Sequence, residues 1–158
     1  MDKLTIRKAV REDVSLIFSF IKGLAKYEKM ENEVVTDEKN LEMNLFDKHQ
    51  ANVLIAEYEG IPAGFALYFY NFSTFLGKHG LYLEDLFVNE EFRGKGIGNA
   101  ILSKLAKIAL EEDCGRLEWW CLDWNEPSID FYKRKGAVPM EEWTTFRVSG
   151  KALEELSK

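Results

Sequence analysis

A glycine-rich turn between a buried strand and an amphipathic helix constrains this chain more than any other feature. The run Leu81–Val88 is apolar on both faces except at Glu84 and Asp85, which predicts a strand in the middle of a sheet. The next turn, Arg93–Gly98, contains three glycines, which let a backbone bend and approach a ligand closely. An amphipathic helix follows and ends near Glu112. This order of strand, turn and helix indicates an α/β protein.

The rest of the chain also alternates between strand and helix patterns. Period-two alternation predicts strands, and periods near 3.6 predict helices. Glu59–Gly60 is typical of a hairpin turn, and Phe72–Gly80 is expected to be a loop. The helices should cover both faces of a mixed sheet. The predicted strands are Leu4–Lys8, Val53–Tyr58, Ala63–Phe72, Leu81–Val88, Arg116–Leu122 and Trp143–Val148; the predicted helices run from Arg11 to Tyr27–Met30, from a Thr36 cap past Phe46, from the glycine turn to about Glu112, from an Asn125 cap to Lys135, and over a short charged segment at the end.

Length and charge narrow the class of protein. A chain of 158 residues predicts a single domain over residues 1–158. Because 27 acidic residues outnumber 21 basic ones, bulk charge does not favour nucleic acid or anionic membranes as partners. Cys114 and Cys121 form neither a disulfide framework nor a zinc ligand set, so no metal is expected. Since there is no signal-peptide pattern and no membrane-length apolar run, we expect a cytoplasmic protein.

The glycine turn has the properties of an anion site. The first N–H groups of the following helix carry positive partial charge, which suits a phosphate or pyrophosphate. Arg93 and Lys95 add two cations. The glycine spacing matches neither a P-loop nor a Rossmann fingerprint. On the turn alone, a tight left-handed bend that binds nothing remains the alternative.

Two spaced motifs carry a resemblance to a known superfamily. Arg93-x-x-Gly96-x-Gly98 resembles the pyrophosphate-binding pattern of the GNAT superfamily of acetyl-CoA-dependent N-acetyltransferases. The segment from Asn125 to Tyr132, followed by Gly136-Ala137, resembles the Asn-x-x-(Ala/Ser)-x-x-x-Tyr helix of that superfamily. The resemblance implies the GNAT fold, whose mixed central sheet is mostly antiparallel, and acetyl-CoA as the acetyl donor.

Four further segments resemble the diamine (spermidine/spermine) acetyltransferase branch. The similarity extends from Ile6-Arg7 to about Trp143 and departs from the branch at Glu59-Gly60 and at Glu118–Trp120. It implies transfer to a primary amine of a small cationic acceptor, a polyamine or diamine, by a homodimer. A thialysine-like or lysine-like acceptor and a non-catalytic CoA-binding module remain alternatives. The segments are Leu24–Glu28, Leu81–Val88, Trp124–Ser128 and Phe131–Arg134.

Amine acetylation requires a group that removes the ammonium proton and a group that protonates the leaving thiolate. Glu84, in an otherwise apolar strand, is the candidate for the first role, although it could also face solvent at a strand end. Strict alternation places Asp85 on the opposite face. Tyr132 is the candidate acid, because it lies two helical turns after Asn125 and a phenol has a pKa of about 10. A packing tyrosine is the alternative.

The resemblance also implies the remaining site residues. The backbone of the strand should pair with pantetheine, and the end of the first helix should bind the amine unless it is only a solvated helix end. Apart from the resemblance, Glu141 and Glu142 form another acidic cluster that could reach a neighbouring subunit's site in a dimer. The candidates for acetyl-CoA are Leu86, Phe87, Val88, Arg93, Gly94, Lys95, Gly96, Ile97, Gly98, Asn99, Asn125, Pro127, Ser128 and Tyr132, and those for the amine are Tyr27, Glu28, Glu84, Glu118, Trp120 and Glu142.

Overall fold

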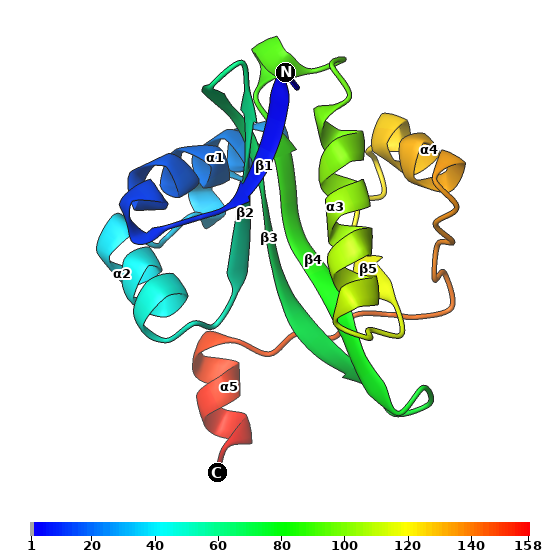
Figure 1. Cartoon of the computed structure of the whole chain (residues 1–158). Helices are drawn as coiled ribbons and strands as arrows, with labels where there is room; N and C mark the ends of the chain where they lie inside the picture. The colour runs from blue at the N-terminus through cyan, green and yellow to red at the C-terminus, as the bar shows by residue number, and fades with distance from the viewer. Residues whose placement is uncertain (1) are drawn as a thin grey trace. The chain divides into compact units, whose positions relative to one another are not determined.

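The computed structural model describes residues 2–158, which group into two compact units divided between Trp120 and Cys121. The first unit contains a five-stranded sheet in the order β1-β2-β3-β4-β5 (Figure 1). The first four strands pair antiparallel and the fifth pairs parallel to β4, which confirms the mixed, mostly antiparallel sheet. The strands are β1 (Leu4–Lys8), β2 (Asn52–Tyr58), β3 (Ile61–Ser73), β4 (Lys78–Val88) and β5 (Leu117–Trp119).

Three α-helices belong to the first unit and two to the second. None of the helices formed by residues 2–158 combines the length and apolar character needed to cross a membrane. The α-helices of the first unit are α1 (Val14–Tyr27), α2 (Glu38–Glu42) and α3 (Ile97–Glu111), and those of the second are α4 (Glu126–Arg134) and α5 (Gly150–Leu156). The first unit also contains the short 3-10 helices η1 (Arg11–Asp13), η2 (Glu31–Glu33) and η4 (Glu90–Phe92) and the π-helix η3 (Met43–Asp47).

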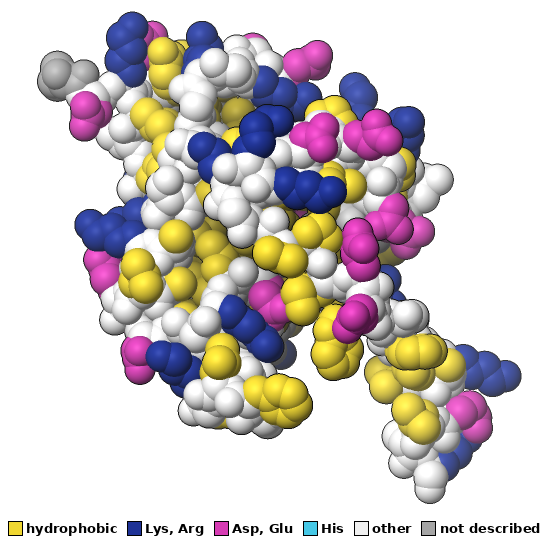
Figure 2. Space-filling view, turned by 90° about the vertical axis from the view of Figure 1, so that its right-hand side faces the viewer, with side chains coloured by type: hydrophobic (Ala, Val, Ile, Leu, Met, Phe, Trp, Pro, Cys, Tyr) yellow, Lys and Arg dark blue, Asp and Glu magenta, His cyan; other side chains and the backbone are white. Residues whose placement is uncertain are grey.

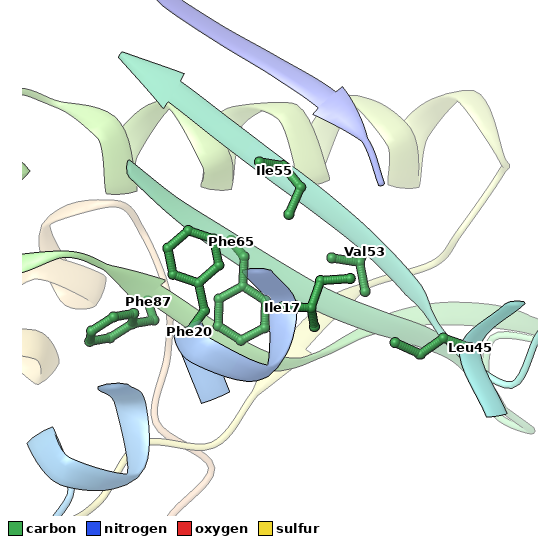
Figure 3. Packing of buried hydrophobic residues seen from close by; sticks show 7 residues of the cluster. All are labelled: Ile17, Phe20, Leu45, Val53, Ile55, Phe65 and Phe87. Atoms are coloured by element: carbon green, nitrogen blue, oxygen red, sulfur yellow. The ribbon is translucent and has the colours of Figure 1, made fainter. Parts of the chain in front are cut away.

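Helices cover both faces of the sheet in the first unit, as expected. On one face, Phe20 of α1 stacks on Phe65 of β3 with ring centroids 5.4 Å apart. Figure 3 shows this cluster, in which Ile17 and Ile55 are fully buried. The alternation of side chains along β2 and β3 turns Leu54 and Ala66 to the other face, which α3 covers. Burial on both faces explains why the central strands are apolar throughout.

The connections between elements of this unit match the sequence predictions only in part. β3 and β4 extend through most of the predicted loop Phe72–Gly80, which leaves only residues 74–77 as the turn. The hairpin turn at Glu59-Gly60 is confirmed, since both residues have positive φ. Asp37, and not Thr36, caps α2, because its Oδ1 accepts a hydrogen bond of 2.7 Å from the backbone N–H of Asn40.

One predicted strand is absent. Trp143–Val148 forms no strand or helix, and residues 121–158 contain no strand. Its alternating pattern is a local signal, whereas a strand also needs a neighbour for its backbone hydrogen bonds. β5 is likewise shorter than the predicted Arg116–Leu122. By contrast, the predicted helices at Asn125–Lys135 and at the end of the chain are confirmed as α4 and α5.

Basic and acidic side chains are mixed on the surface of the protein. On the face shown in Figure 2, Lys and Arg side chains are interspersed with Asp and Glu side chains and with hydrophobic ones. A mixed surface of this kind does not create a field of one sign over that face. Local groups therefore decide which ligand each part of the chain attracts.

Candidate active site

The glycine turn opens directly into the N-terminus of α3. Gly94 and Gly96 both have φ of +78°, a left-handed conformation that favours glycine. Gly96 is the N-cap and has no side chain with which to cap this helix end. The helical ladder starts with Ala100, whose N–H donates to the Gly96 carbonyl at 3.0 Å. The preceding N–H groups therefore have no acceptor within the helix and can bind an anion.

Gly98 leaves open space beside this helix end. A Cβ built there would meet no other atom within 4 Å, and Gly98 does not have a positive φ. Folding therefore does not require glycine at this position, whereas a ligand lying close to the backbone would. Gly96 differs, because its φ would strain any other residue. Substitutions at Gly98 and Gly96 can thus distinguish an effect on ligand binding from an effect on folding.

We expect Gly98→Ala to weaken acetyl-CoA binding about tenfold or more, a loss of about 1.4 kcal/mol. The added methyl group would occupy the space through which the pyrophosphate approaches the backbone. The same change should leave the melting temperature equal or higher, because alanine favours a helix. Calorimetry and thermal unfolding measure the two effects. Unchanged affinity in Gly98→Ala would show that the turn does not bind acetyl-CoA. Gly96→Ala is the comparison, because it should lower the melting temperature as well as the affinity.

The two cations of the turn take different positions. Arg93 Nε donates to the Val88 carbonyl at 3.0 Å, and its guanidinium lies 5.0 Å from the Tyr27 ring centroid. Arg93 therefore joins the turn to the end of β4 and to the last residue of α1. Lys95 instead places its Nζ 5.3 Å from the ring centroid of Tyr58 on β2. Both cations remain exposed beside the turn.

The last part of β4 has no strand on one side. The pairing of β4 with β5 ends at Leu83 and Trp119, while β4 continues to Val88. Just beyond β4, the Asn89 N–H donates to Ala63 at the β3 side. Alternation then directs the N–H groups of Leu86 and Val88 to the side where β5 has ended. An extended ligand with amide groups can pair with this edge as an added strand.

Phe87 and Ile97 have buried side chains, so only their backbones are available to a ligand in this region. The Phe87 side chain is 8% exposed and belongs to the core cluster with Phe20 and Phe65. Ile97, the first residue of α3, is buried as well. Leu86 is half-buried on the α3 face, and Asn99 is exposed on the first turn of α3. The candidate donor residues of the first unit thus lie along one path from the β4 edge to the start of α3.

Glu84 is the extra residue of a β-bulge. Tyr68 of β3 pairs with Leu83, whereas the preceding Leu67 pairs with Asp85, so Glu84 has no partner in the register. The bulge interrupts strict alternation. The expectation that Asp85 turns away from any pocket used by Glu84 rested on that alternation and is wrong. Asp85 lies on the same face of the sheet as Phe87, beneath α1.

Three carboxyl groups interact at this bulge. Burial, together with the smaller effects of the Glu84 and Glu28 charges, raises the pKa of Asp85 to about 7. Burial, followed by the charge of Glu84, raises the pKa of Glu28 at the end of α1. Burial, followed by the charges of Glu84, Glu118 and Asp85, raises the pKa of Tyr82 to about 12. The structure thus brings Glu28 and Glu84 together and adds Asp85, which the sequence analysis excluded.

The raised pKa of Asp85 predicts a dependence of stability on pH. A folded-state pKa above the unfolded value favours the folded state at low pH, and this contribution is lost as pH rises to about 7. Asp85→Asn should therefore raise the free energy of unfolding by roughly 2–4 kcal/mol at pH 8 and by little near pH 4. Denaturant unfolding at both pH values measures this. The exposed Asp130→Asn is the control, and equal effects of Asp85→Asn at the two pH values would contradict the assignment.

Other amine-side candidates lie on the same face of β4 and β5. Glu118 is opposite Tyr82 in the register, and its Oε1 lies 2.8 Å from Arg116 Nε. Trp120 is 62% exposed, and its ring centroid is 6.1 Å from that of Tyr82 in a T-shaped arrangement. The face therefore presents aromatic rings and an ion pair in addition to the carboxylates.

The remaining candidates belong to the second unit. Asn125 is buried at the N-cap of α4, and Pro127 lies in the first turn of that helix. Tyr132 is half-buried two turns later, with its ring centroid 5.6 Å from that of Phe131. Gly136, at φ +90°, follows the end of this helix. Ser128 is half-buried on α4 and Glu142 is exposed beyond it.

Comparisons with known proteins agree with this geometry. Residues 14–137 match the model of the acetyltransferase (GNAT) family. A thialysine N-epsilon-acetyltransferase of Sus scrofa is 36% identical over 99% of both chains. The human spermidine/spermine N(1)-acetyltransferase-like protein 1 is 32% identical over 99% of this chain and 24% of its own length. An integron cassette protein from the V. cholerae mobile metagenome has a TM-score of 0.83 at 29% identity, covering 100% of this chain and 99% of that one.

Proposed function

The chain belongs to the acetyltransferase (GNAT) family, and on this premise we propose that it moves acetyl from acetyl-CoA to a primary amine of a small cationic acceptor. The observation that carries this proposal is the cluster of three carboxyl groups from Glu28, Glu84 and Asp85. The cluster lies where the pairing of β4 with β5 ends. An ammonium is attracted to these carboxylates, and an extended donor fits the adjacent edge. The two substrates would therefore meet at the bulge.

The donor would be bound along the path described for the β4 edge and the start of α3. The open side of Leu86 and Val88 suits the amides of the pantetheine arm. The free N–H groups after Gly96 suit the pyrophosphate, with Arg93 and Lys95 adding positive charge. When bound, acetyl-CoA supplies an activated thioester. We assign Asn125, Pro127 and Ser128 to the same donor because the family motif includes them.

In this arrangement, a named residue can carry out each of the two proton transfers that the reaction requires. The amine nitrogen bonds to the thioester carbonyl carbon while the carbon–sulfur bond breaks. The coupled Glu84–Asp85 pair accepts the proton of the amine, and a group with pKa about 7 is a better base than an ordinary carboxylate. An N–H on the β4 edge would stabilise the developing oxyanion. Tyr132 would donate its phenolic proton to the leaving thiolate.

Two classes of cationic acceptor suit the carboxyl groups of Glu28, Glu84 and Asp85. The sequence resemblance favours a polyamine or diamine. A thialysine-like or lysine-like amine is the second candidate, because the pig relative named for thialysine aligns over the whole chain. Both classes present a primary amine on a flexible carbon chain. Tyr27, Glu28, Glu118 and Trp120 are the groups we assign to acceptor binding, with Glu142 as a contribution from a partner subunit.

We further propose that residues 1–158 act as one domain, in a cytoplasmic homodimer. The family match extends from residue 14 to residue 137 and therefore crosses the boundary between the two compact units. Acetyl-CoA is an intracellular metabolite, which supports the location. The dimer rests on the resemblance to the diamine acetyltransferase branch.

Release of CoA thiol in the presence of an amine panel tests the proposed function. We expect release that depends on spermidine, putrescine, cadaverine or L-lysine, with an acetylated amine found by mass spectrometry. Turnover of a multiply charged polyamine should weaken with salt more than that of a singly charged amine, because salt screens its attraction to the carboxylates. Acetyl-CoA binding without thiol release would instead support the non-catalytic CoA-binding module.

A further inference from the structure

We propose that the acceptor is a lysine-like or ornithine-like amino acid, and that Arg116 of this chain binds its α-carboxylate. The inference rests on the proposed acetyltransferase function and names the acceptor class of the same site. It comes from a pair of opposite charges that a polyamine would not need. Arg116 immediately precedes β5 and Glu118 lies within it, two residues apart and therefore on one face of the sheet.

The register places this ion pair on the face that carries the carboxylates. Glu118 is opposite Tyr82, and Tyr82 is opposite Phe69 of β3. The Tyr82 and Phe69 ring centroids are 5.1 Å apart, and the charges of both Glu84 and Glu118 raise the pKa of Tyr82. Tyr82 thus lies between the reactive end of the site and the ion pair. The methylene groups of an acceptor can pack on these rings.

The spacing suits an amino acid with a basic side chain. Two residues along a strand advance about 6.6 Å, and neighbouring strands lie about 4.8 Å apart. The backbones at Glu84 and Glu118 are therefore separated by roughly 8 Å. A lysine or ornithine side chain has a length of this order. Its terminal amine would lie at the bulge while its α-carbon groups reach β5.

The ion pair offers one partner to each charge of an amino-acid head group. The bridge uses Arg116 Nε, which leaves the planar Nη1 and Nη2 donors able to bind a carboxylate. Glu118 would attract the α-ammonium, and the exposed ring of Trp120 adds a cation–π surface. The far end of a diamine brings a positive charge toward Arg116 and gains nothing from it.

The neighbouring strands hold Arg116 in this position. A Cβ at Gly80 of β4 would lie 3.1 Å from Arg116 Cγ and 2.6 Å from Asn71 Oδ1, so only glycine lets Arg116 lie this close to the strand. The Asn71 side chain also donates to Glu118 Oε1 at 3.4 Å. Both Arg116 and Glu118 remain over one third exposed, which keeps them accessible to a ligand.

L-Lysine and cadaverine form a matched pair that differs only by the α-carboxylate. We expect wild-type kcat/KM to be at least about tenfold higher for L-lysine, since a charged, paired hydrogen bond is lost with cadaverine. Arg116→Gln should reduce this ratio to near one, mainly through the KM for L-lysine. Gly80→Ala, which displaces Arg116 without removing charge, should reduce the ratio too. Arg11→Gln, at an exposed ion pair beside η1, should leave it unchanged.

The other possible results overturn either the acceptor assignment or the proposed function. A wild-type preference for cadaverine or spermidine over L-lysine overturns the inference while leaving the acetyltransferase function in place. So does a lysine preference that survives Arg116→Gln. If no amine supports thiol release, the proposed function itself is wrong, and the acceptor assignment falls with it. The wild-type comparison requires no variant, so it holds even if Arg116→Gln fails to fold.

Discussion

Replacing Tyr132 with phenylalanine is expected to lower kcat by about 100-fold or more, the effect typical of a lost acid–base group. The ring and its packing beside Phe131 on α4 remain, so the helix should be retained. Only the hydroxyl that would protonate the leaving thiolate is removed. Because this interaction strengthens in the transition state, the dissociation constant of acetyl-CoA should change little. Steady-state kinetics and calorimetry separate the two quantities.

Tyr70→Phe is the matched control for this experiment. Tyr70 also carries a phenol, but it stacks on His79 near the β3–β4 turn, with ring centroids 5.1 Å apart. We expect it to keep wild-type kcat. Full kcat in Tyr132→Phe, measured where chemistry limits the rate, would make Tyr132 a packing residue.

Glu84→Gln should both slow the reaction and move its dependence on pH. We expect kcat to fall by about 100-fold, because Glu84 belongs to the pair that takes the ammonium proton. Wild-type kcat/KM should show an acid limb near pH 7, set by the raised pKa of Asp85. Since the charge of Glu84 contributes to that raised pKa, its removal should lower the pKa and shift the limb to lower pH. Rate profiles from pH 5 to pH 9, flanking the neutral range, measure both effects.

Glu28→Gln is the comparison for that shift. The Glu28 charge is a smaller contribution to the raised pKa of Asp85 than burial or Glu84. We therefore expect a smaller movement of the acid limb in the same direction, with the main effect on the KM of the amine. An acid limb that stays in place in Glu84→Gln would show that the Glu84–Asp85 pair does not control the essential proton.

The glycine turn and the strand before it were accessible from sequence because their signals are local. Positive φ at Gly94 and Gly96 favours glycine, and the burial of Leu81 and Leu83 explains the apolar strand. Trp143–Val148 shows the limit of such signals. Its alternation predicts a strand, but pairing depends on another segment that a local pattern cannot supply.

Asp85 could not be assigned correctly for a related reason. A β-bulge is defined by the register between two strands, and nothing in the Glu84-Asp85 dipeptide indicates that one of them is an extra residue. Its pKa likewise depends on burial beneath α1 and on Glu28, which is more than fifty residues earlier in the chain. The ion pair at Arg116 depends in the same way on Gly80 of the neighbouring strand.

A single-turnover experiment with labelled acetyl-CoA and L-lysine tests the central claim most directly. Mass spectrometry would follow the label while a thiol reagent follows CoA. We expect one labelled acetyl group on the side-chain amine for each thiol released, and a much slower transfer in Tyr132→Phe. Thiol release without acetylated amine, with L-lysine and with the other amines alike, would contradict the claim that this chain is an amine acetyltransferase.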